Sequence, residues 1–336
     1  MAADSGYEFV ALPDEVRRVP RPHARHDIRP PGTGSFMLRV RYRVEQPVHI
    51  GAGHWFLQER RAVRAAVRSG DKLVIPGSSL KGMLRARYEA ITKSCCPGER
   101  APKDAELKGA IPSRKRAGYR VKFADAIHAH PVFAGSCMAG GPMCAACALF
   151  GCMSLRARVS CFDLVPNNAA VAVVSVAKRF SPRPHHLGYY DVDEARRTLH
   201  VKRLHGRKFH VGGQQDSDVS ARGGRRGKSR GGQASGGGRE WLEVIPKDVE
   251  LEGRVVCVNV TPAEAGGLLC ALGFVPESTV RIGSAKALGL GVLEPKNLAP
   301  IGVMDPMFDD MCNMFSQSDD YYRQGEQRLL GMFGGL

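Results

Sequence analysis

The order of strand-like and helix-like segments restricts the fold of this chain more than any other feature of its sequence. Residues 37–44 (MLRVRYRV) alternate apolar and basic side chains, which predicts a strand with one exposed, positively charged face. Residues 83–91 space their apolar side chains as a helix does. Further strands are expected over 72–75, 159–165, 169–176 and 280–293. With a second helix, this order predicts an α+β fold with a ferredoxin-like (RRM-like) βαββαβ core.

The second helix is bounded by residues typical of helix ends. Thr261 suits the N-cap, Pro262 the first helical position, and Glu264 completes a capping box three residues after the cap. Gly273 is expected to end this helix at about residue 272.

Composition divides the chain into three parts. Residues 1–35 contain five prolines and mixed charge, which predicts an extended arm without a core of its own. The core is expected over 36–300, with long insertions at about 93–150 and about 178–240. Residues 301–336 carry six acidic residues against two arginines and are expected to form an acidic C-terminal tail.

The charge of the chain favours a polyanionic partner. The sequence has 49 Lys and Arg against 33 Asp and Glu, giving a net charge of +16. Residues 222–239 contain six Lys/Arg, eight Gly and no acid, which predicts a flexible loop. No apolar run is long enough to cross a membrane, and no secretory signal is visible. Ten cysteines without such a signal suit a reducing compartment, so we expect a soluble, cytoplasmic protein without membrane partners.

A turn from strand to helix is the strongest local signal for ligand binding. Residues 74–82 (VIPGSSLKG) place Ser78, Ser79 and Lys81 at a helix start, where free backbone N–H groups attract phosphate. The spacing of a Walker A loop is absent. The alternative interpretation is a serine N-cap beside a glycine turn that binds nothing.

A cysteine-rich stretch predicts a structural Zn²⁺ site. Cys144 and Cys147 have the two-residue spacing of a zinc knuckle, and tetrahedral zinc requires two further ligands. We expect Cys137 and one residue of the Cys95–Cys96 pair. The preferred set is Cys96, Cys137, Cys144 and Cys147, with Cys95, His128 and His130 as substitutes.

Several segments together resemble the RAMP superfamily of CRISPR effector proteins. In chain order they are HIGAG (49–53), IPGSSLKG (75–82), LFG (149–151), Arg158-Val159, Phe162-Asp163, LHGRKFH (204–210) and GSAKALGLG (283–291). The resemblance covers most of the chain, from Val44 to Glu294. It excludes the arm, the Arg/Gly loop and the acidic tail.

The resemblance implies a backbone subunit of a type VII or type III-D-like effector complex. Such subunits polymerise along a CRISPR guide RNA and present it for pairing with complementary target RNA. Implied partners are further copies of this chain, a repeat-tag-capping RAMP subunit and a metallo-β-lactamase-like nuclease. The insertion at about 178–240 would form a thumb, and that at about 93–150 would hold the zinc.

Residues with an implied role in RNA binding follow from the matching motifs. Lysines and arginines would contact phosphates, and the ring of Phe209 would stack or wedge between bases; a core position is the alternative for Phe209. The set is His49, Ser78, Ser79, Lys81, Arg85, Arg207, Lys208, Phe209 and Lys286.

The chain departs from the cleaving members of the resembled family in the loop over 52–73. These members carry a catalytic aspartate there, whereas this loop holds only Glu59 and Asp71 as acids and has Arg60 and Arg61 at the best-matching positions. We therefore expect no catalytic residue and target cleavage by a separate subunit. One alternative is metal-dependent RNase activity of its own, with Glu59 or His54 as base. Another is a free-standing zinc-containing RNA-binding protein.

Overall fold

An antiparallel sheet forms the centre of the molecule. The computed structural model describes residues 6–96, 102–106, 118–135, 137–177, 188–212, 239–274, 278–301 and 308–334. Strand order in the central sheet is β10-β16-β2-β18-β17, and β9 also pairs with β16. These strands are β2 (Gly34–Val44), β9 (Val159–Cys161), β10 (Val165–Pro166), β16 (Glu250–Val260), β17 (Val280–Arg281) and β18 (Val292–Ile301). The chain is therefore a mixed α+β protein.

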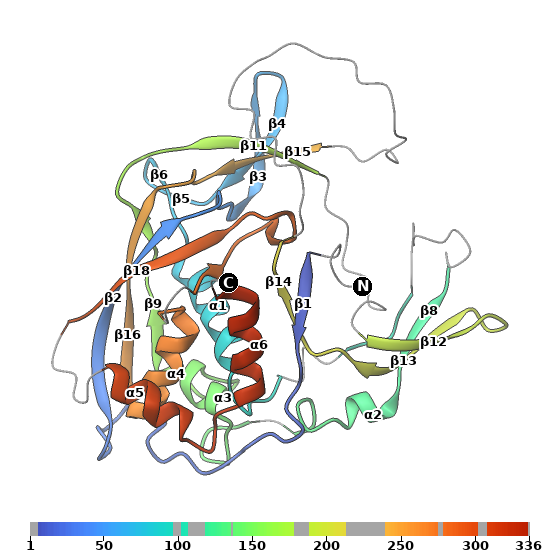
Figure 1. Ribbon diagram of the computed structural model, residues 1–336, viewed down its shortest axis with the longest axis vertical. Helices are drawn as coiled ribbons and strands as arrows, with labels where there is room; N and C mark the ends of the chain where they lie inside the picture. Colours follow the sequence, from blue (N-terminus) through green and yellow to red (C-terminus); the bar gives the residue numbers. More distant parts are fainter. Residues whose placement is uncertain are drawn as a thin grey trace.

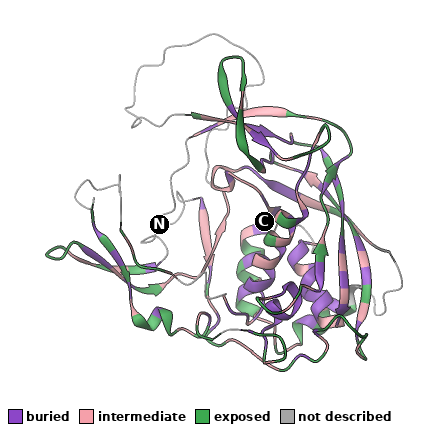
Figure 2. Ribbon diagram, turned by 180° about the vertical axis from the view of Figure 1, so that it is seen from behind, coloured by how far each residue is buried: buried purple, intermediate pink, exposed green. Residues whose placement is uncertain are grey.

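Two helices lie along the chain between the long strands and pack on one face of this sheet (Figure 1). α1 (Gly77–Ala90) follows β2, and α4 (Pro262–Leu272) follows β16. Their apolar side chains share one buried cluster with β2, and the buried residues face the sheet in Figure 2. The expected capping box of α4 is confirmed: the Thr261 side chain accepts from the Glu264 amide, and Gly273 ends the helix with φ 84°.

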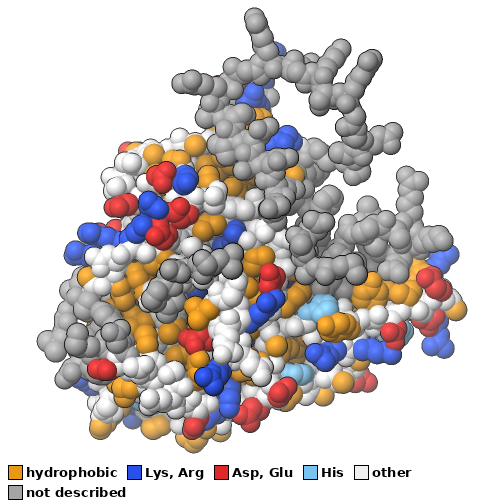
Figure 3. All heavy atoms as spheres, in the orientation of Figure 1, with side chains coloured by type: hydrophobic (Ala, Val, Ile, Leu, Met, Phe, Trp, Pro, Cys, Tyr) orange, Lys and Arg blue, Asp and Glu red, His pale blue; other side chains and the backbone are white. Residues whose placement is uncertain are grey.

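The two faces of β2 differ as its alternation predicts. Leu38, Val40 and Tyr42 are fully buried beneath the helices. On the other face, Arg41 lies 2.7 Å from Glu252, and Arg43 lies 3.0 Å from Glu294. Figure 3 shows basic and acidic side chains side by side on the face that it displays. β2 thus has the expected basic face, but carboxylates of the neighbouring strands offset its charge.

Two smaller sheets flank the central one. One has the order β11-β15-β4-β3, and its β3–β4 hairpin projects away from the helices at the top of Figure 1. The other, β12-β13-β8-β7, packs on α2 (Asp125–His128). Their strands are β3 (Gly51–Gln58), β4 (Arg61–Ala66), β7 (Ala105–Glu106), β8 (Arg120–Phe123), β11 (Ala172–Ala177), β12 (Gly188–Asp193), β13 (Thr198–Leu204) and β15 (Arg239–Val244).

The second flanking sheet joins the two long insertions expected from the sequence. β8, from the first insertion, pairs in parallel with β13 of the second. Short elements elsewhere in the fold are β5 (Arg68–Ser69), β6 (Lys72–Leu73), α3 (Ala145–Phe150) and the 3₁₀ turn η4 (Lys286–Leu288). Except for Arg239, the Arg/Gly-rich stretch 222–239 lies outside the described residues.

The first and last segments of the chain pack on each other and on the core. β1 (Tyr7–Val10) pairs with β14 (Arg207–His210). Within the acidic segment 301–336, α5 (Phe308–Ser316) and α6 (Arg323–Phe333) are helices. Arg21 in the expected arm lies 2.7 Å from Asp320, between these two helices. None of the described helices is both long and apolar enough to span a membrane.

Candidate nucleic-acid interface

A pocket of about 440 Å³ opens where three of the motif-bearing segments meet. Its walls come from the first turns of α1, from β14, and from the glycine-rich stretch around η4, which lie close together in Figure 1. Four of the nine residues predicted to bind RNA line it: Ser79, Lys208, Phe209 and Lys286. Segments more than 200 residues apart in the sequence thus form one site.

The pocket is lined by cationic groups without a carboxylate among its described residues. Arg87, Lys208, Arg281 and Lys286 contribute positive charge. Burial lowers the pKa of Lys208, Arg281 and Lys286, which shows that these groups lose hydration. Burial, together with Lys208 and Lys286, lowers the pKa of His210 to about 4, so its ring is neutral at pH 7. A phosphate group would relieve the unbalanced charge.

Glycines let the loop beside η4 approach the start of β3. Gly283 has φ +86°, and a Cβ there would lie 2.5 Å from the carbonyl oxygen of His49. The Ser284 amide donates to that same oxygen at 2.9 Å. His49 is buried, and its Nδ1 lies 2.7 Å from the backbone oxygen of Glu243. His49 therefore supports the loop from behind instead of lining the pocket.

The other residues predicted to bind RNA lie outside the pocket lining. Ser78 is exposed, and Lys81 is half-buried, which lowers the pKa of its ammonium group. Arg85 and Arg207 lie 2.8 and 3.1 Å from the Glu89 carboxylate. The structure thus gives these two guanidinium groups interior partners.

Two cationic residues of the pocket, Arg87 and Arg281, were not among those expected. Arg87 lies on the same helical face as Ser79 and Met83, so the period of α1 could have identified it. Arg281 directly precedes the glycine-rich stretch, and this position beside a motif was the available signal. His210, which also lines the pocket, ends the LHGRKFH motif, a segment expected to take part in RNA binding.

The segment 52–73, in which cleaving members of the resembled family carry their aspartate, is largely the β3–β4 hairpin. Glu59 and Arg60 form its tip, with φ values of 47° and 63°. The Glu59 carboxylate is exposed, 3.8 Å from Arg61. Asp71 lies in the separate turn between β5 and β6. Neither acid belongs to a group of potential metal ligands within the described residues.

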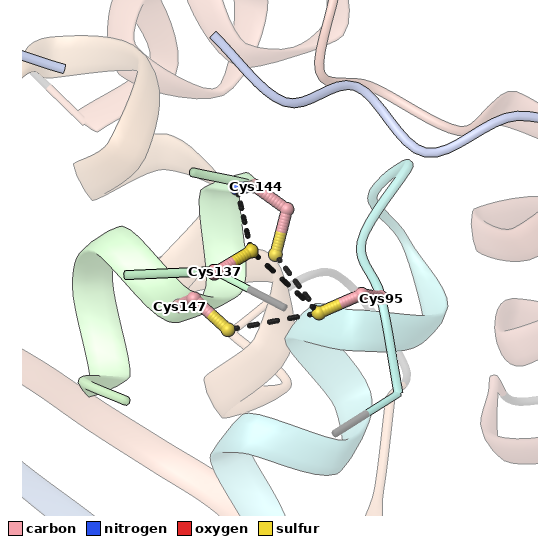
Figure 4. A group of neighbouring side chains, drawn as sticks. All are labelled: Cys95, Cys137, Cys144 and Cys147. Atoms are coloured by element: carbon pink, nitrogen blue, oxygen red, sulfur yellow. Dashed lines mark hydrogen bonds between the residues drawn. The ribbon is translucent and has the colours of Figure 1, made fainter. Parts of the chain in front are cut away.

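Four buried cysteines form the one such group within the described ranges (Figure 4). The sulfur of Cys95 lies 3.9, 3.6 and 3.7 Å from those of Cys137, Cys144 and Cys147. A tetrahedral ion with metal–sulfur bonds of about 2.3 Å separates its sulfurs by about 3.8 Å. The four cysteines could therefore hold a metal ion such as Zn²⁺.

The expected set is corrected at one position, because Cys95 takes the place of Cys96. After α1 the chain turns so that Cys95 points into the cluster, while the Cys96 sulfur lies 2.8 Å from Nη1 of Arg207. Hydrogen bonds from Cys137, Cys147 and Cys95 hold the pKa of Cys144 well below its usual range. His128 and His130 do not belong to the group.

Replacing Cys95 should remove the metal, whereas replacing its neighbour should not. We expect Cys95→Ser to bind at least tenfold less Zn²⁺ than wild type, since an alcohol is a poor zinc ligand beside three thiolates. Cys96→Ser should retain one Zn²⁺ per chain. Elemental analysis of both purified variants is the measurement. Zinc loss from Cys96→Ser alone would contradict the assignment.

His210 should titrate at unusually low pH until an anion enters the pocket. Because burial and neighbouring cations disfavour the imidazolium, its pKa is lowered to about 4. Bound phosphate offsets these cations, so the pKa should rise, and affinity should increase as the pH falls from 6.5 towards 4. NMR of the ring protons with and without RNA checks this. Titration near 6.5 that RNA leaves unchanged would place the phosphate elsewhere.

Comparisons with known proteins give a family for the chain. No curated protein matches it. Among 146 matching chains of solved structures is one in the cryo-EM structure of the Type III-B Cmr-beta bound to cognate target RNA. That match has 9% identity and a TM-score of 0.36, and it covers 80% of this chain but only 61% of the other. The RAMP superfamily matches residues 41–294, more than half of the sequence. The chain therefore belongs to the RAMP superfamily.

Proposed function

We propose that this chain is an RNA-binding backbone subunit of a CRISPR effector complex. The observation that carries the proposal is the pocket between α1, β14 and the glycine-rich loop. Its described lining residues include several cations and no carboxylate. Membership of the RAMP superfamily supports it, since the matched residues 41–294 include every lining residue of the pocket except Phe333. In this proposal the bound polyanion is the phosphate backbone of guide RNA.

The central sheet suits a ferredoxin-like core, which we include in the proposal. Its chain order is β2-α1-β9-β16-α4-β18, and its spatial order is β9-β16-β2-β18 with antiparallel neighbours. Two β-α-β units with both helices on one face give this arrangement. It places the start of α1 beside the loop that precedes β18, where the pocket forms.

Different residues of the pocket would make different contacts with RNA. Lys208 and Lys286 would pair with phosphate oxygens, and the Ser79 hydroxyl would donate to one. Phe209 lines the same pocket, and its ring lies 6.0 Å from that of Phe333 in an edge-to-face pair. Its core packing favours a fixed wall over a mobile wedge. Contacts of this kind carry no base information, as a subunit that accepts any guide requires.

Target cleavage is assigned to another subunit in this proposal. Glu59 lies at an exposed hairpin tip and is followed in sequence by Arg60 and Arg61. Arginines neither accept a proton nor bind a divalent metal. The proposed assembly is a type VII or type III-D-like complex: guide RNA, target RNA, further copies of this chain, a repeat-tag-capping RAMP subunit and a metallo-β-lactamase-like nuclease. A structural Zn²⁺ at the four cysteines would stabilise the loop that they join.

Removing one pocket cation should weaken RNA binding regardless of sequence. Lys286→Ala should reduce affinity several-fold and flatten the dependence of log affinity on log salt by about one unit, as expected for one lost phosphate contact. Lys296→Ala is the matched control, because Lys296 pairs with Glu294 on β18 outside the pocket. Fluorescence anisotropy with two unrelated RNA sequences measures both quantities. Equal salt slopes for both variants would indicate that RNA binds outside the pocket.

The chain with guide RNA should bind complementary RNA and leave it intact in Mg²⁺ or Mn²⁺. Neither acid of the 52–73 segment belongs to a group of three or more potential metal ligands in the described structure, which predicts that no bound metal activates water there. Gel analysis of end-labelled target checks this, with Glu59→Ala in parallel. Regular cuts by wild type that disappear in Glu59→Ala would replace the proposal with a self-cleaving subunit.

A further inference from the structure

A buried carboxylate stands between the four-cysteine group and the RNA pocket. Glu89 lies in the last turn of α1 and is 1% exposed. Its Oε1 lies 2.8 Å from Nε of Arg85, and its Oε2 lies 3.1 Å from Nη1 of Arg207. These two arginines come from segments 122 residues apart in sequence number, so the carboxylate joins two parts of the fold.

Arg85 continues this connection to the cysteines. Its Nη2 lies 3.9 Å from the sulfur of Cys147, and its Nη1 donates to the carbonyl oxygen of Gly151 at 3.2 Å. Burial lowers the pKa of Arg85, but the hydrogen bond to Glu89 and the charge of that carboxylate raise it by more, so that the net shift is upward. The guanidinium thus lies between a carboxylate and the sulfur cluster.

Arg207 continues the connection toward the pocket. Its Nη2 donates to the carbonyl oxygen of Ser94 at 2.8 Å and lies 3.4 Å from that of Cys95. Arg207 is the first residue of β14, and the next three residues of that strand, 208–210, all line the pocket. The backbone that presents a cysteine ligand is therefore tied to the strand that presents Lys208.

A bound metal would strengthen each part of this connection. Four thiolates and one Zn²⁺ carry a net charge of −2, and a buried dianion requires a nearby cation such as Arg85. The metal would also fix the backbone at Cys95, and with it the acceptors of Arg207. Because Glu89 pairs with both arginines, fixing the position of one guanidinium group also restricts the position of the other.

We propose that Glu89 is a positioning residue that couples Zn²⁺ occupancy of the four cysteines to RNA affinity of the pocket. The inference rests on the proposed function, because it assigns RNA to that pocket. Coupling between two binding sites is reciprocal, so RNA tightens zinc binding by the same factor as zinc tightens RNA binding. Glu89 touches neither ligand and acts through Arg85 and Arg207.

The test measures zinc affinity of the full chain by competition with a chelator, with and without a saturating single-stranded RNA. In wild type we expect RNA to tighten zinc binding about fivefold or more. In Glu89→Gln the chain should still bind one Zn²⁺, but the effect of RNA should fall below about twofold. Glu252→Gln removes the same charge from an exposed pair with Arg41 and should behave as wild type.

The outcomes distinguish failure of the coupling from failure of the proposed RNA-binding function. An equal effect of RNA in wild type and Glu89→Gln, or no effect in wild type that nevertheless binds RNA, overturns the coupling alone. Wild type that binds no RNA contradicts the proposed function instead.

A second variant covers the case in which Glu89→Gln fails to fold. Arg207→Lys keeps the charge but lacks the fork that reaches Glu89 and Ser94 together, so it should also lose the coupling. Hydrogen exchange of the β14 amides gives a readout in wild type: exchange should rise when zinc is removed. Unchanged exchange in β14 overturns the proposal.

Discussion

A carboxylate withdrawn from water organises the centre of this molecule. Glu89 is buried, and removing one partner from a buried ion pair costs about 3–5 kcal/mol. Arg85 and Arg207 are therefore required by the fold before any ligand is considered. α1 consequently has two functional faces. Ser79 and Arg87 face the pocket, whereas Arg85 and Glu89 face the cysteine group and β14.

Local patterns predicted the elements that depend on local chemistry. The alternation over 37–44 predicted β2, and the capping box predicted the start of α4. Both signals depend only on residues that are neighbours in the sequence. The parallel pairing of β8 with β13 depends on residues about 80 positions apart, and no local pattern encodes it. The acidic segment 301–336 was expected to be a tail because of its charge. Met311 and Phe315 nevertheless bury one face of α5.

The sequence predicted which segments form the site much better than it predicted which side chains line it. The motifs identified the walls formed by α1, β14 and the glycine-rich stretch, but not Phe333 of α6. Lysines and arginines within the motifs also look alike in sequence. Which of them meets solvent depends on helix rotation and on the carboxylates that the fold places beside them, as Glu89 of α1 lies beside Arg85 and Arg207. The choice between Cys95 and Cys96 has the same origin. Adjacent residues point in different directions, and the turn after α1 decides which one enters the cluster.

The wall formed by Phe333 has a consequence for the order of synthesis. Its ring lines the pocket 5.4 Å from the Arg87 guanidinium, and its carbonyl oxygen accepts from the Thr279 amide at 2.7 Å. Ser79, Lys208 and Lys286 all leave the ribosome before residue 333 does. The pocket lining is therefore incomplete until α6 has been made and packs on α1.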